Sequence, residues 1–539
     1  MSEVSANASA EITPNIAAAA QPAARERSAR AGSIHRGVEH THDLELHCDV
    51  VVVGSGAGGA VVATELALAG QRVIVLEEGP HLTAAEHGAL RPSESIRHVW
   101  RDAAMTIAWP IGDTPPINVT AGRVVGGSST LTGGVCFRVP EHVHEVWLGE
   151  RGLPADLGRK AMEPCYEAVE QAMQVETVPV SARSRGAALF AEGMERTGHA
   201  LHPMQRNTHD CKGEGRCNFG CPHGAKKSVD QSYLPRAVAA GAEIYADSLV
   251  ERILFDGDRA IGVEGWVLDN PRAKKRLRLR VKARRVVVAC GGMHSPMLLA
   301  RSGVGKASGH LGKHMTLHPG FRMIASFDEP IFGWRGAMQP AFSDDFHAER
   351  ITLTGLFIPQ GVIAATMPGA GKRHVERARN LRHLAMFGGM IHDDGGGRVW
   401  RGPGREPVLT YRMAREDRAA IPVIIRRMAE TFFAAGAREC FLPVLGLEPV
   451  DADGLRKLDL TKVPAKQLEC SSQHPLGSCR MSATKESGVV DPEGRVWGTR
   501  ELYVVDGSIV PTSLGVNPQV GIMAMATRIV WRMRERALV

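Results

Sequence analysis

The sequence predicts an α/β fold built on a buried parallel sheet, and one stretch near its beginning carries most of that prediction. Residues 50–53 are four consecutive valines. Four residues are too few for a helix, and the run is too apolar for an edge strand. It therefore predicts a parallel strand buried on both faces. Residues 60–68 predict a helix that ends before Gly70, and residues 73–76 predict a second buried strand. This order of strand, helix and strand is the unit from which Rossmann-like sheets are built.

The glycines between the first strand and the helix fit the pattern G-x-G-x-x-G. Gly54, followed by Ser55, makes the tight turn, Gly56 lets a pyrophosphate approach the backbone, and Gly59 lets the helix pack on the strand. Glu77 ends the second strand, where it is placed to accept hydrogen bonds from a ribose. The unit therefore predicts binding of an adenine dinucleotide, but it does not choose between NAD and FAD.

Length and composition limit the class of protein. A chain of 539 residues with 44% hydrophobic and 23% charged residues is typical of a globular protein with two domains. The net charge of +7, from 65 basic and 58 acidic residues, is small for this length and argues against nucleic-acid binding. Ten cysteines without a secretory signal indicate a reducing compartment, and no apolar run is long enough for a transmembrane segment. We expect a cytoplasmic protein, with membrane association left open.

The pattern along the chain divides it into three parts. Residues 1–45 have few large apolar side chains and are predicted to form a disordered tail. A discontinuous cofactor-binding domain is expected from residues 46–150, 225–320 and 470–539. Residues 151–224 and 321–469 are expected to form a mixed α+β substrate-binding domain.

A second glycine-rich segment, residues 122–134, supplies the resemblance to a known family. Its glycine density indicates backbone lying close to a flat or charged group. Together with the first unit, it resembles the glucose-methanol-choline (GMC) oxidoreductases, FAD-dependent enzymes whose pattern G-R-x-x-G-G-S-S lies along the flavin. The resemblance implies that FAD is the cofactor and that Gly126, Gly127, Ser128 and Thr132 contact it. It departs at Thr132, where the family usually carries Asn.

Later segments extend the resemblance. Residues 291–303 follow a predicted buried strand at 286–289 and resemble a second family signature, which residues 311–319 continue. Residues 472–481, 503–511 and 515–519 resemble the terminal signatures. The resemblance implies that His474 and Asn517 are catalytic, and that the following residues also bind the cofactor: Val250, Asp506, Gly507, Asn517 and Pro518.

Residues 248–284 predict a three-stranded meander, with strands at 248–255, 260–268 and 276–284. Five basic residues share one face of the last strand, and we interpret that face as solvated. Before the meander, residues 153–175 predict an amphipathic helical pair.

Three cysteines in eleven residues form a second candidate site. Cys211, Cys217 and Cys221, with glycines between them, could supply several thiolates to one metal centre. Their C-x5-C-x3-C spacing is similar to that of bacterial FAD-dependent sugar dehydrogenases, which hold a three-iron, four-sulfur (3Fe-4S) cluster. The alternative is a glycine-rich loop with reduced thiols and no metal.

Residues 321–469 carry no motif that we can connect to chemistry. They predict a strand at 321–327 and a helix at 415–435 that Pro422 kinks or splits. Residues 351–367 are strongly apolar, which favours a hydrophobic substrate, although an ordinary core strand explains them equally well.

These observations predict a GMC-type FAD-dependent alcohol dehydrogenase or oxidase, nearest in appearance to the bacterial long-chain alcohol oxidases. His474 is expected to act as general base on the hydroxyl while Asn517 binds the same oxygen, giving an aldehyde or ketone. The electron acceptor could be oxygen, a quinone or a cytochrome. One alternative is a sugar or polyol dehydrogenase that passes electrons through a cysteine-bound cluster to a cytochrome, and another is a nucleotide-binding module without turnover.

Overall fold

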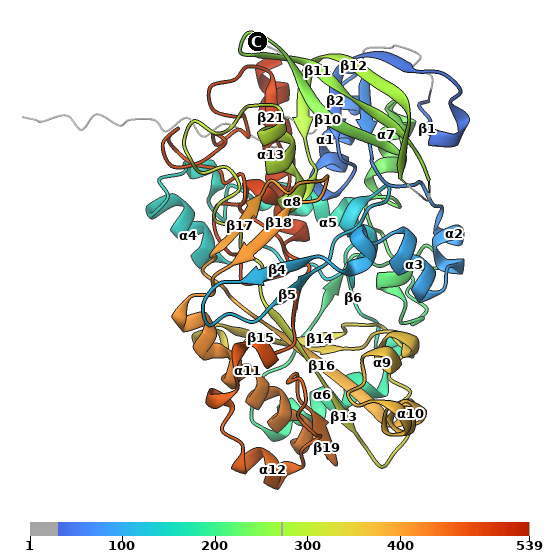
Figure 1. Cartoon of the computed structure of the whole chain (residues 1–539), viewed down its shortest axis with the longest axis vertical. Helices are drawn as coiled ribbons and strands as arrows, with labels where there is room; N and C mark the ends of the chain where they lie inside the picture. The colour runs from blue at the N-terminus through green and yellow to red at the C-terminus, as the bar shows by residue number, and fades with distance from the viewer. Residues whose placement is uncertain (1–30, 271–272, 538–539) are drawn as a thin grey trace, which may run out of the picture.

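A computed structural model describes residues 31–270 and 273–537, and this part of the chain contains two large sheets (Figure 1). The eight-stranded sheet lies at one end of the molecule, and helices α6, α11 and α12 lie at the other (Figure 1). The path through this sheet is β1-β9-β3-β2-β12-β11-β10, and β21 pairs with β12. Its strands are β1 Ile34–His35, β2 Leu44–Val53, β3 Val73–Leu76, β9 Glu243–Tyr245, β10 Ser248–Asp256, β11 Arg259–Asp269, β12 Lys274–Val288 and β21 Leu502–Val504.

The centre of this sheet is parallel, as the valine run predicts. β2 pairs in parallel with β3 and β12, and Val50, Val51 and Val52 are each at most 1% exposed. The meander β10–β12 is confirmed. However, the expected strands at 276–284 and 286–289 are one strand, β12, which pairs antiparallel with β11 and parallel with β2 and β21. A single long strand therefore joins the meander to the parallel sheet.

Helix α1, Ala57–Leu68, is buried almost all round because its sequence is apolar on every side. It packs against α7, Tyr233–Ala239, and α13, Gln519–Ala537. α13 also packs on α5, Glu163–Ala172. The first half of the helical pair expected at 153–175 is only a 3-10 turn, Ala155–Leu157, because Pro154 and Gly158 limit it on both sides.

The second sheet forms the other half of the molecule. Its strand order is β17-β18-β4-β5-β20-β13-β16-β15-β14-β7, and β19 pairs with β13. The bounds are β4 Ile107–Pro110, β5 Ile117–Val119, β7 His202–Pro203, β13 Gly320–Ser326, β14 Ala341–Ser343, β15 Ile351–Leu356, β16 Leu384–Ile391, β17 Gly397–Trp400, β18 Val408–Tyr411, β19 Glu439–Phe441 and β20 Cys470–Ser472. A separate pair joins β6 Glu176–Thr177 to β8 Gln205–Arg206.

Two helices cover this second sheet. α6, Arg185–Arg196, packs on β15 and β16, and α11, Arg415–Ala434, packs on β13 and β16. The stacked rings of Phe387 and Phe432, 3.7 Å apart, join β16 to α11. Pro422 lies inside α11 but does not split it. The shorter helices are α2 Ala84–Ala89, α3 Pro92–His98, α4 Glu141–Gly149, α8 Gly291–Arg301, α9 Gln360–Thr366, α10 Gly371–Arg379 and α12 Ala452–Lys457.

The expectation of a disordered tail at residues 1–45 is wrong for its last part, which contains β1 and the start of β2. Ile34 and His35 form β1, which pairs in parallel with β9. The backbone N–H of Gly37 donates to Asp247, 3.0 Å away. This segment is ordered although it has few apolar residues, because the neighbouring sheet supplies its hydrogen-bond partners. The rest of that prediction, residues 1–30, lies outside the described residues.

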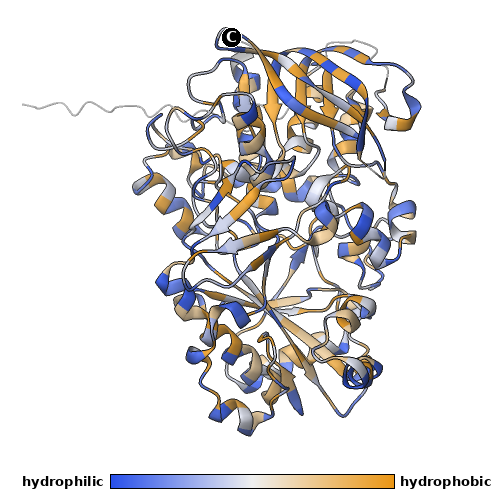
Figure 2. Cartoon of the chain, in the orientation of Figure 1, coloured by the Kyte–Doolittle hydropathy of each residue, from blue (hydrophilic) through white to orange (hydrophobic). Residues whose placement is uncertain are grey.

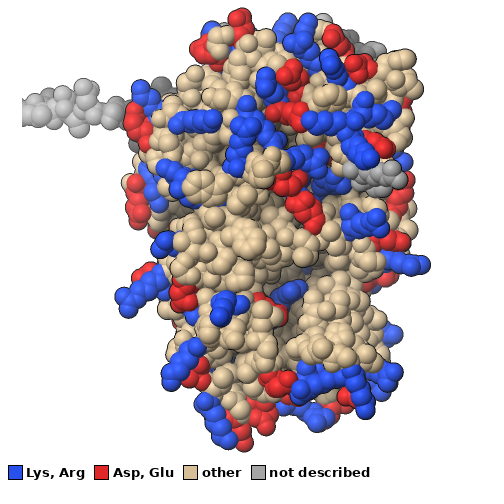
Figure 3. Space-filling view, in the orientation of Figure 1, with Lys and Arg blue, Asp and Glu red and all other residues tan. Residues whose placement is uncertain are grey.

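The surface agrees with the predicted charge pattern. Along β11 and β12, polar and apolar residues alternate (Figure 2), and Arg278 and Arg280 are exposed while Leu279 and Val281 are buried. Positive and negative side chains are mixed over the visible face (Figure 3). Within the described ranges, no helix has the length and apolar character needed to cross a membrane.

Candidate active site

Two adjoining cavities lie between the sheets. The first, about 210 Å³, is at the carboxyl ends of β2, β3 and β12, where α/β sheets bind their ligands. The second, about 280 Å³, is walled by strands of the second sheet. Both are lined by Ser128, Ser129, His474 and Pro518, so the two cavities meet at these residues. A cofactor in the first cavity could therefore react with a substrate in the second.

Two glycines of the first motif, Gly54 and Gly59, leave no space for a side chain. A Cβ on Gly54 would lie 2.3 Å from the carbonyl oxygen of Ala289, and one on Gly59 would lie 2.0 Å from that of Gly54. Gly127 packs on Gly56, because a Cβ on it would lie 2.8 Å from the Gly56 Cα. Backbone from both glycine-rich segments thus faces the first cavity, where helix α1 begins. A helix N-terminus of this kind suits a pyrophosphate.

Glu77 lines the first cavity, and hydrogen bonds from neighbouring residues hold its carboxylate in place. Its carboxylate accepts hydrogen bonds from the Ser55 N–H and hydroxyl, at 3.1 and 2.7 Å, and from the Gly79 N–H at 2.9 Å. The Ser55 hydroxyl in turn accepts from the Gly126 N–H at 2.9 Å. Burial raises the pKa of Glu77 despite these donors. Since a carboxylate can accept about four hydrogen bonds, it retains capacity toward the cavity.

The predicted cofactor residues fall into three groups. Those that line the first cavity are Gly54, Gly56, Glu77, Gly127, Ser128, Val250, Asp506, Gly507 and Pro518. Thr132 and Asn517 line the second cavity instead. Ser55, Gly59 and Gly126 lie behind the first cavity's wall and hold its glycine-rich backbone in place.

The first cavity also contains a charged network whose residues are not among the predicted site residues. Arg101 donates to Glu78 at 2.8 Å and to Glu406 at 3.0 Å, and Arg405 lies 3.2 Å from Glu78. His294 lies 2.8 Å from Glu406. Burial opposes ionisation of Glu78, but Arg101 and Arg405 outweigh it and lower the pKa of this carboxyl to about 2. No local pattern could reveal this network, because Arg101 and Glu406 are 305 positions apart.

The second cavity has mainly apolar walls with a few polar groups. Phe321 and Met390 come from β13 and β16, and Phe342 and Leu356 come from β14 and β15. Arg322, Gln339 and Thr354 are among its polar lining residues. A cavity of this composition fits a small organic substrate.

His474 lies where the two cavities meet. Nδ2 of Asn517 is 3.3 Å from its Nε2. The His474 N–H donates to the Ser472 hydroxyl at 3.1 Å, which fixes the backbone. Burial, reinforced by neighbouring His318, lowers the pKa of His474 to about 3. The imidazole is therefore neutral at pH 7.

His318 is a member of the site to which the sequence assigned no role. Its Nδ1 lies 3.2 Å from Nδ1 of His474, and its Nε2 accepts the N–H groups of Leu514 and Gly515 at 3.1 and 3.2 Å. The residue is 2% exposed and has a φ of +48°, which is uncommon outside glycine. Such strained residues persist where their surroundings over-determine them.

Asp393 fixes the backbone around His318. Its carboxylate accepts from the N–H groups of Leu317 and His318, both at 2.9 Å, and from the hydroxyls of Tyr411 and Ser513. The side chain is fully buried, and burial raises its pKa. One carboxylate thus joins the segment that carries His318 to residues 513–515, the last two of which donate their backbone N–H groups to the His318 ring.

Lys226 connects the cysteine loop to the second glycine-rich segment. Its ammonium donates to the carbonyls of Thr130 and Thr132, at 2.5 and 3.1 Å, and to that of Cys217 at 2.7 Å. The residue is 3% exposed, and burial lowers its pKa to about 8. Lys226 therefore stabilises the second glycine-rich segment, which lines both cavities.

The three cysteines of the second candidate site line a cavity of only about 20 Å³. Cys217 Sγ accepts a hydrogen bond from the buried Arg206 guanidinium at 3.0 Å. Cys211 and Cys221 are partly exposed. This space holds about one water molecule, so the geometry gives no support to an iron–sulfur cluster.

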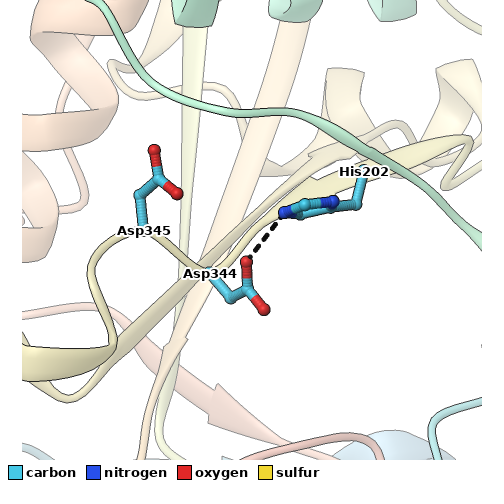
Figure 4. Close-up of side chains that lie close together, drawn as sticks. All are labelled: His202, Asp344 and Asp345. Carbon is cyan, nitrogen blue, oxygen red and sulfur yellow. Dashed lines mark ion pairs between the residues drawn. The ribbon is translucent and has the colours of Figure 1, made fainter.

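One exposed group in the described residues brings three potential metal ligands together: His202, Asp344 and Asp345 (Figure 4). His202 and Asp344 form an ion pair at 3.1 Å. Asp345 accepts from the backbone N–H of Ala200 at 2.6 Å. These contacts join β7 to the end of β14 without a metal.

Comparison with known proteins identifies the family. The model of the N-terminal GMC oxidoreductase domain matches residues 48–320, and that of the C-terminal domain matches residues 401–526. The chain belongs to the GMC oxidoreductases. An uncharacterised GMC-type oxidoreductase of Mycobacterium tuberculosis is 36% identical over 89% of this chain and 74% of its own length. The Arabidopsis thaliana long-chain-alcohol oxidase FAO1 is 28% identical, over 93% of this chain and 69% of its own.

Solved structures share the GMC fold at low identity. Formate oxidase of Aspergillus oryzae superposes with a TM-score of 0.72 at 15% identity, over 93% of this chain and all of its own. Pyridoxine 4-oxidase from Mesorbium loti gives 0.67 at 19% identity, over 90% and 99% of the two chains. The predicted family and α/β flavoenzyme fold are thus confirmed.

Proposed function

We propose that this GMC oxidoreductase binds FAD in the first cavity and oxidises an alcohol in the second. The fit of the first cavity supports FAD: two glycine-rich backbones, the α1 N-terminus and Glu77 match the needs of a pyrophosphate and a ribose. We also propose a cofactor domain and a substrate domain, because the two sheets have separate cores. Their bounds differ from the sequence-based ones, since residues 153–173 pack in the first core and residues 108–119 pack in the second.

The observation that carries the proposed reaction is the position of His474 where the cavities meet, next to Asn517 in the second cavity. When bound, FAD supplies the acceptor for a hydride from the carbinol carbon. An alcohol is a poor hydride donor until its hydroxyl proton is leaving. His474 takes that proton and Asn517 binds the hydroxyl oxygen, so the product is an aldehyde or ketone.

The walls of the second cavity favour a hydrophobic alcohol over a sugar. Phe321, Phe342 and Met390 offer apolar contact, whereas a sugar would need more polar partners. The long-chain-alcohol oxidases of Arabidopsis thaliana among the relatives agree with this choice. Relatives named as oxidases also favour oxygen as electron acceptor over a quinone or cytochrome.

Anaerobic titration of the flavin absorbance with aliphatic, aromatic, sterol and sugar alcohols tests the proposal. We expect aliphatic alcohols to bleach the flavin. Bleaching by sugars alone, together with bound iron, would support the sugar dehydrogenase with a 3Fe-4S relay instead. Bound flavin that no alcohol reduces would support the nucleotide-binding module.

A further inference from the structure

The hydrogen bonds of His318 determine where its ring proton lies. Two backbone N–H groups, of Leu514 and Gly515, point at its Nε2, so this nitrogen must offer its lone pair. Burial lowers the pKa of His318 to about 3, so the ring is neutral and carries one proton. That proton is on Nδ1. Turning the ring over would leave both backbone donors facing a carbon.

Nδ1 of His318 faces Nδ1 of His474 at 3.2 Å. Since the His318 nitrogen is the donor, the His474 nitrogen must be the acceptor. We infer that His318 is a positioning residue that holds resting His474 in the tautomer protonated on Nε2, the nitrogen facing Asn517. The Asn517 amide oxygen, and not Nδ2, then faces that N–H. The oxygen and nitrogen of an amide are assigned from the hydrogen bonds they make, so this orientation follows from the His474 tautomer.

This inference rests on the proposed function and adds a step to it. In its resting tautomer His474 offers a hydrogen to the alcohol oxygen and cannot accept a proton at Nε2. To become the base, His474 must release its Nε2 proton to water and take up a proton from water on Nδ1, where the new N–H would meet the Nδ1–H of His318. Two hydrogens do not fit in a 3.2 Å gap between nitrogens, so His318 must turn or shift before the proton is transferred.

One substitution separates the two functions of the His318 ring. In H318Q the amide oxygen can reach the place of Nε2 and still accept from Leu514 and Gly515, but nothing donates to His474 Nδ1. His474 is then free to carry a proton on either nitrogen or on both. The other titratable groups near the pair are Asp393, which favours the imidazolium, and His392, which interacts with His318. Both are unchanged in H318Q.

The tautomer can be read by ¹⁵N NMR of the FAD-bound enzyme labelled in histidine, with His474 assigned by comparison with H474Q. We expect wild-type His474 to carry its proton on Nε2 alone, and H318Q to show a measurable share on Nδ1. A wild-type proton on Nδ1, or a H318Q spectrum identical to wild type, would overturn the inference. If H318Q does not fold, the wild-type spectrum alone decides.

The pH dependence of flavin reduction gives a second readout. In H318Q His474 can be protonated at both nitrogens, so its pKa rises and the loss of rate at low pH begins at a higher pH than in wild type. An unchanged profile would contradict the inference. If no alcohol reduces the flavin, the proposed function is wrong. The NMR spectrum tests the His474 tautomer independently of that result.

Discussion

The side-chain amide of Asn517 lies 3.3 Å from Nε2 of His474, so the two side chains can contact one substrate oxygen together. They come from segments 43 positions apart that both end at the junction of the cavities. Pro518, next to Asn517, lines both cavities.

Asn517→Ala is expected to slow flavin reduction about fivefold, because one neutral hydrogen bond is worth about 1 kcal/mol and about 1.4 kcal/mol corresponds to tenfold. Asn517 orients the hydroxyl but takes no proton, so the effect should be smaller than that of replacing His474. Anaerobic rapid mixing measures it, with rates normalised to bound flavin. A loss as large as that of His474→Ala would give Asn517 a different role.

Lys226→Met should destabilise the protein by about 3 kcal/mol, the upper range for hydrogen bonds to a charged group. Four carbonyls, those of Ser129, Thr130, Thr132 and Cys217, lose a donor. FAD content should fall with stability because Thr130 and Thr132 belong to the segment between the cavities. Lys227→Met, at the half-exposed neighbouring position, is the control. Equal denaturation midpoints for the two variants would refute this role.

Glu78 should make stability depend on pH. Its pKa is lowered to about 2 in the folded protein and is about 4.3 when unfolded, so its ion pairs stabilise fully above about pH 5. That contribution is lost as the pH falls toward 2. Thermal unfolding between pH 5 and pH 3 should show a smaller decline for Glu78→Gln than for wild type. Exposed Glu145→Gln is the control, and parallel curves for all three proteins would disprove the contribution.

The cysteine loop should contain no iron. The small cavity and the Arg206 hydrogen bond to Cys217 indicate a reduced loop. We expect iron and sulfide assays on anaerobically purified protein to read background, and Cys211→Ser and Cys221→Ser to keep flavin reduction near the wild-type rate. Stoichiometric iron, lost in all single Cys-to-Ser variants, would restore the electron-relay hypothesis.

The parts of the fold that the sequence predicts are those set by short-range patterns. Val50 to Val53 and the glycines after them predict β2, the turn and α1, because burial on both faces and a tight turn each leave a local pattern. The same holds for the meander. β1 escaped prediction because Ile34 and His35 carry too little apolar surface to indicate a strand without their partner β9.

Half of the candidate site follows from motifs and half does not. His474 and Asn517 stand in segments that resemble the family, so the sequence names both. The contact of His318 with His474 joins positions 156 apart, and Asp393 acts through backbone N–H groups that any residue could supply. Such pairings depend on strand order in the second sheet, which periodicity does not encode.

The rate of flavin reduction in His474→Ala tests the central claim most directly. Wild-type and variant enzyme, matched for bound FAD, would be mixed anaerobically with an aliphatic alcohol that bleaches the wild-type flavin. If His474 takes the hydroxyl proton, the variant should be slower by roughly a hundredfold to ten-thousandfold, the usual contribution of a general base, while the oxidised spectrum hardly changes. Unimpaired reduction in the variant, at equal FAD content, would contradict the assignment of the active site.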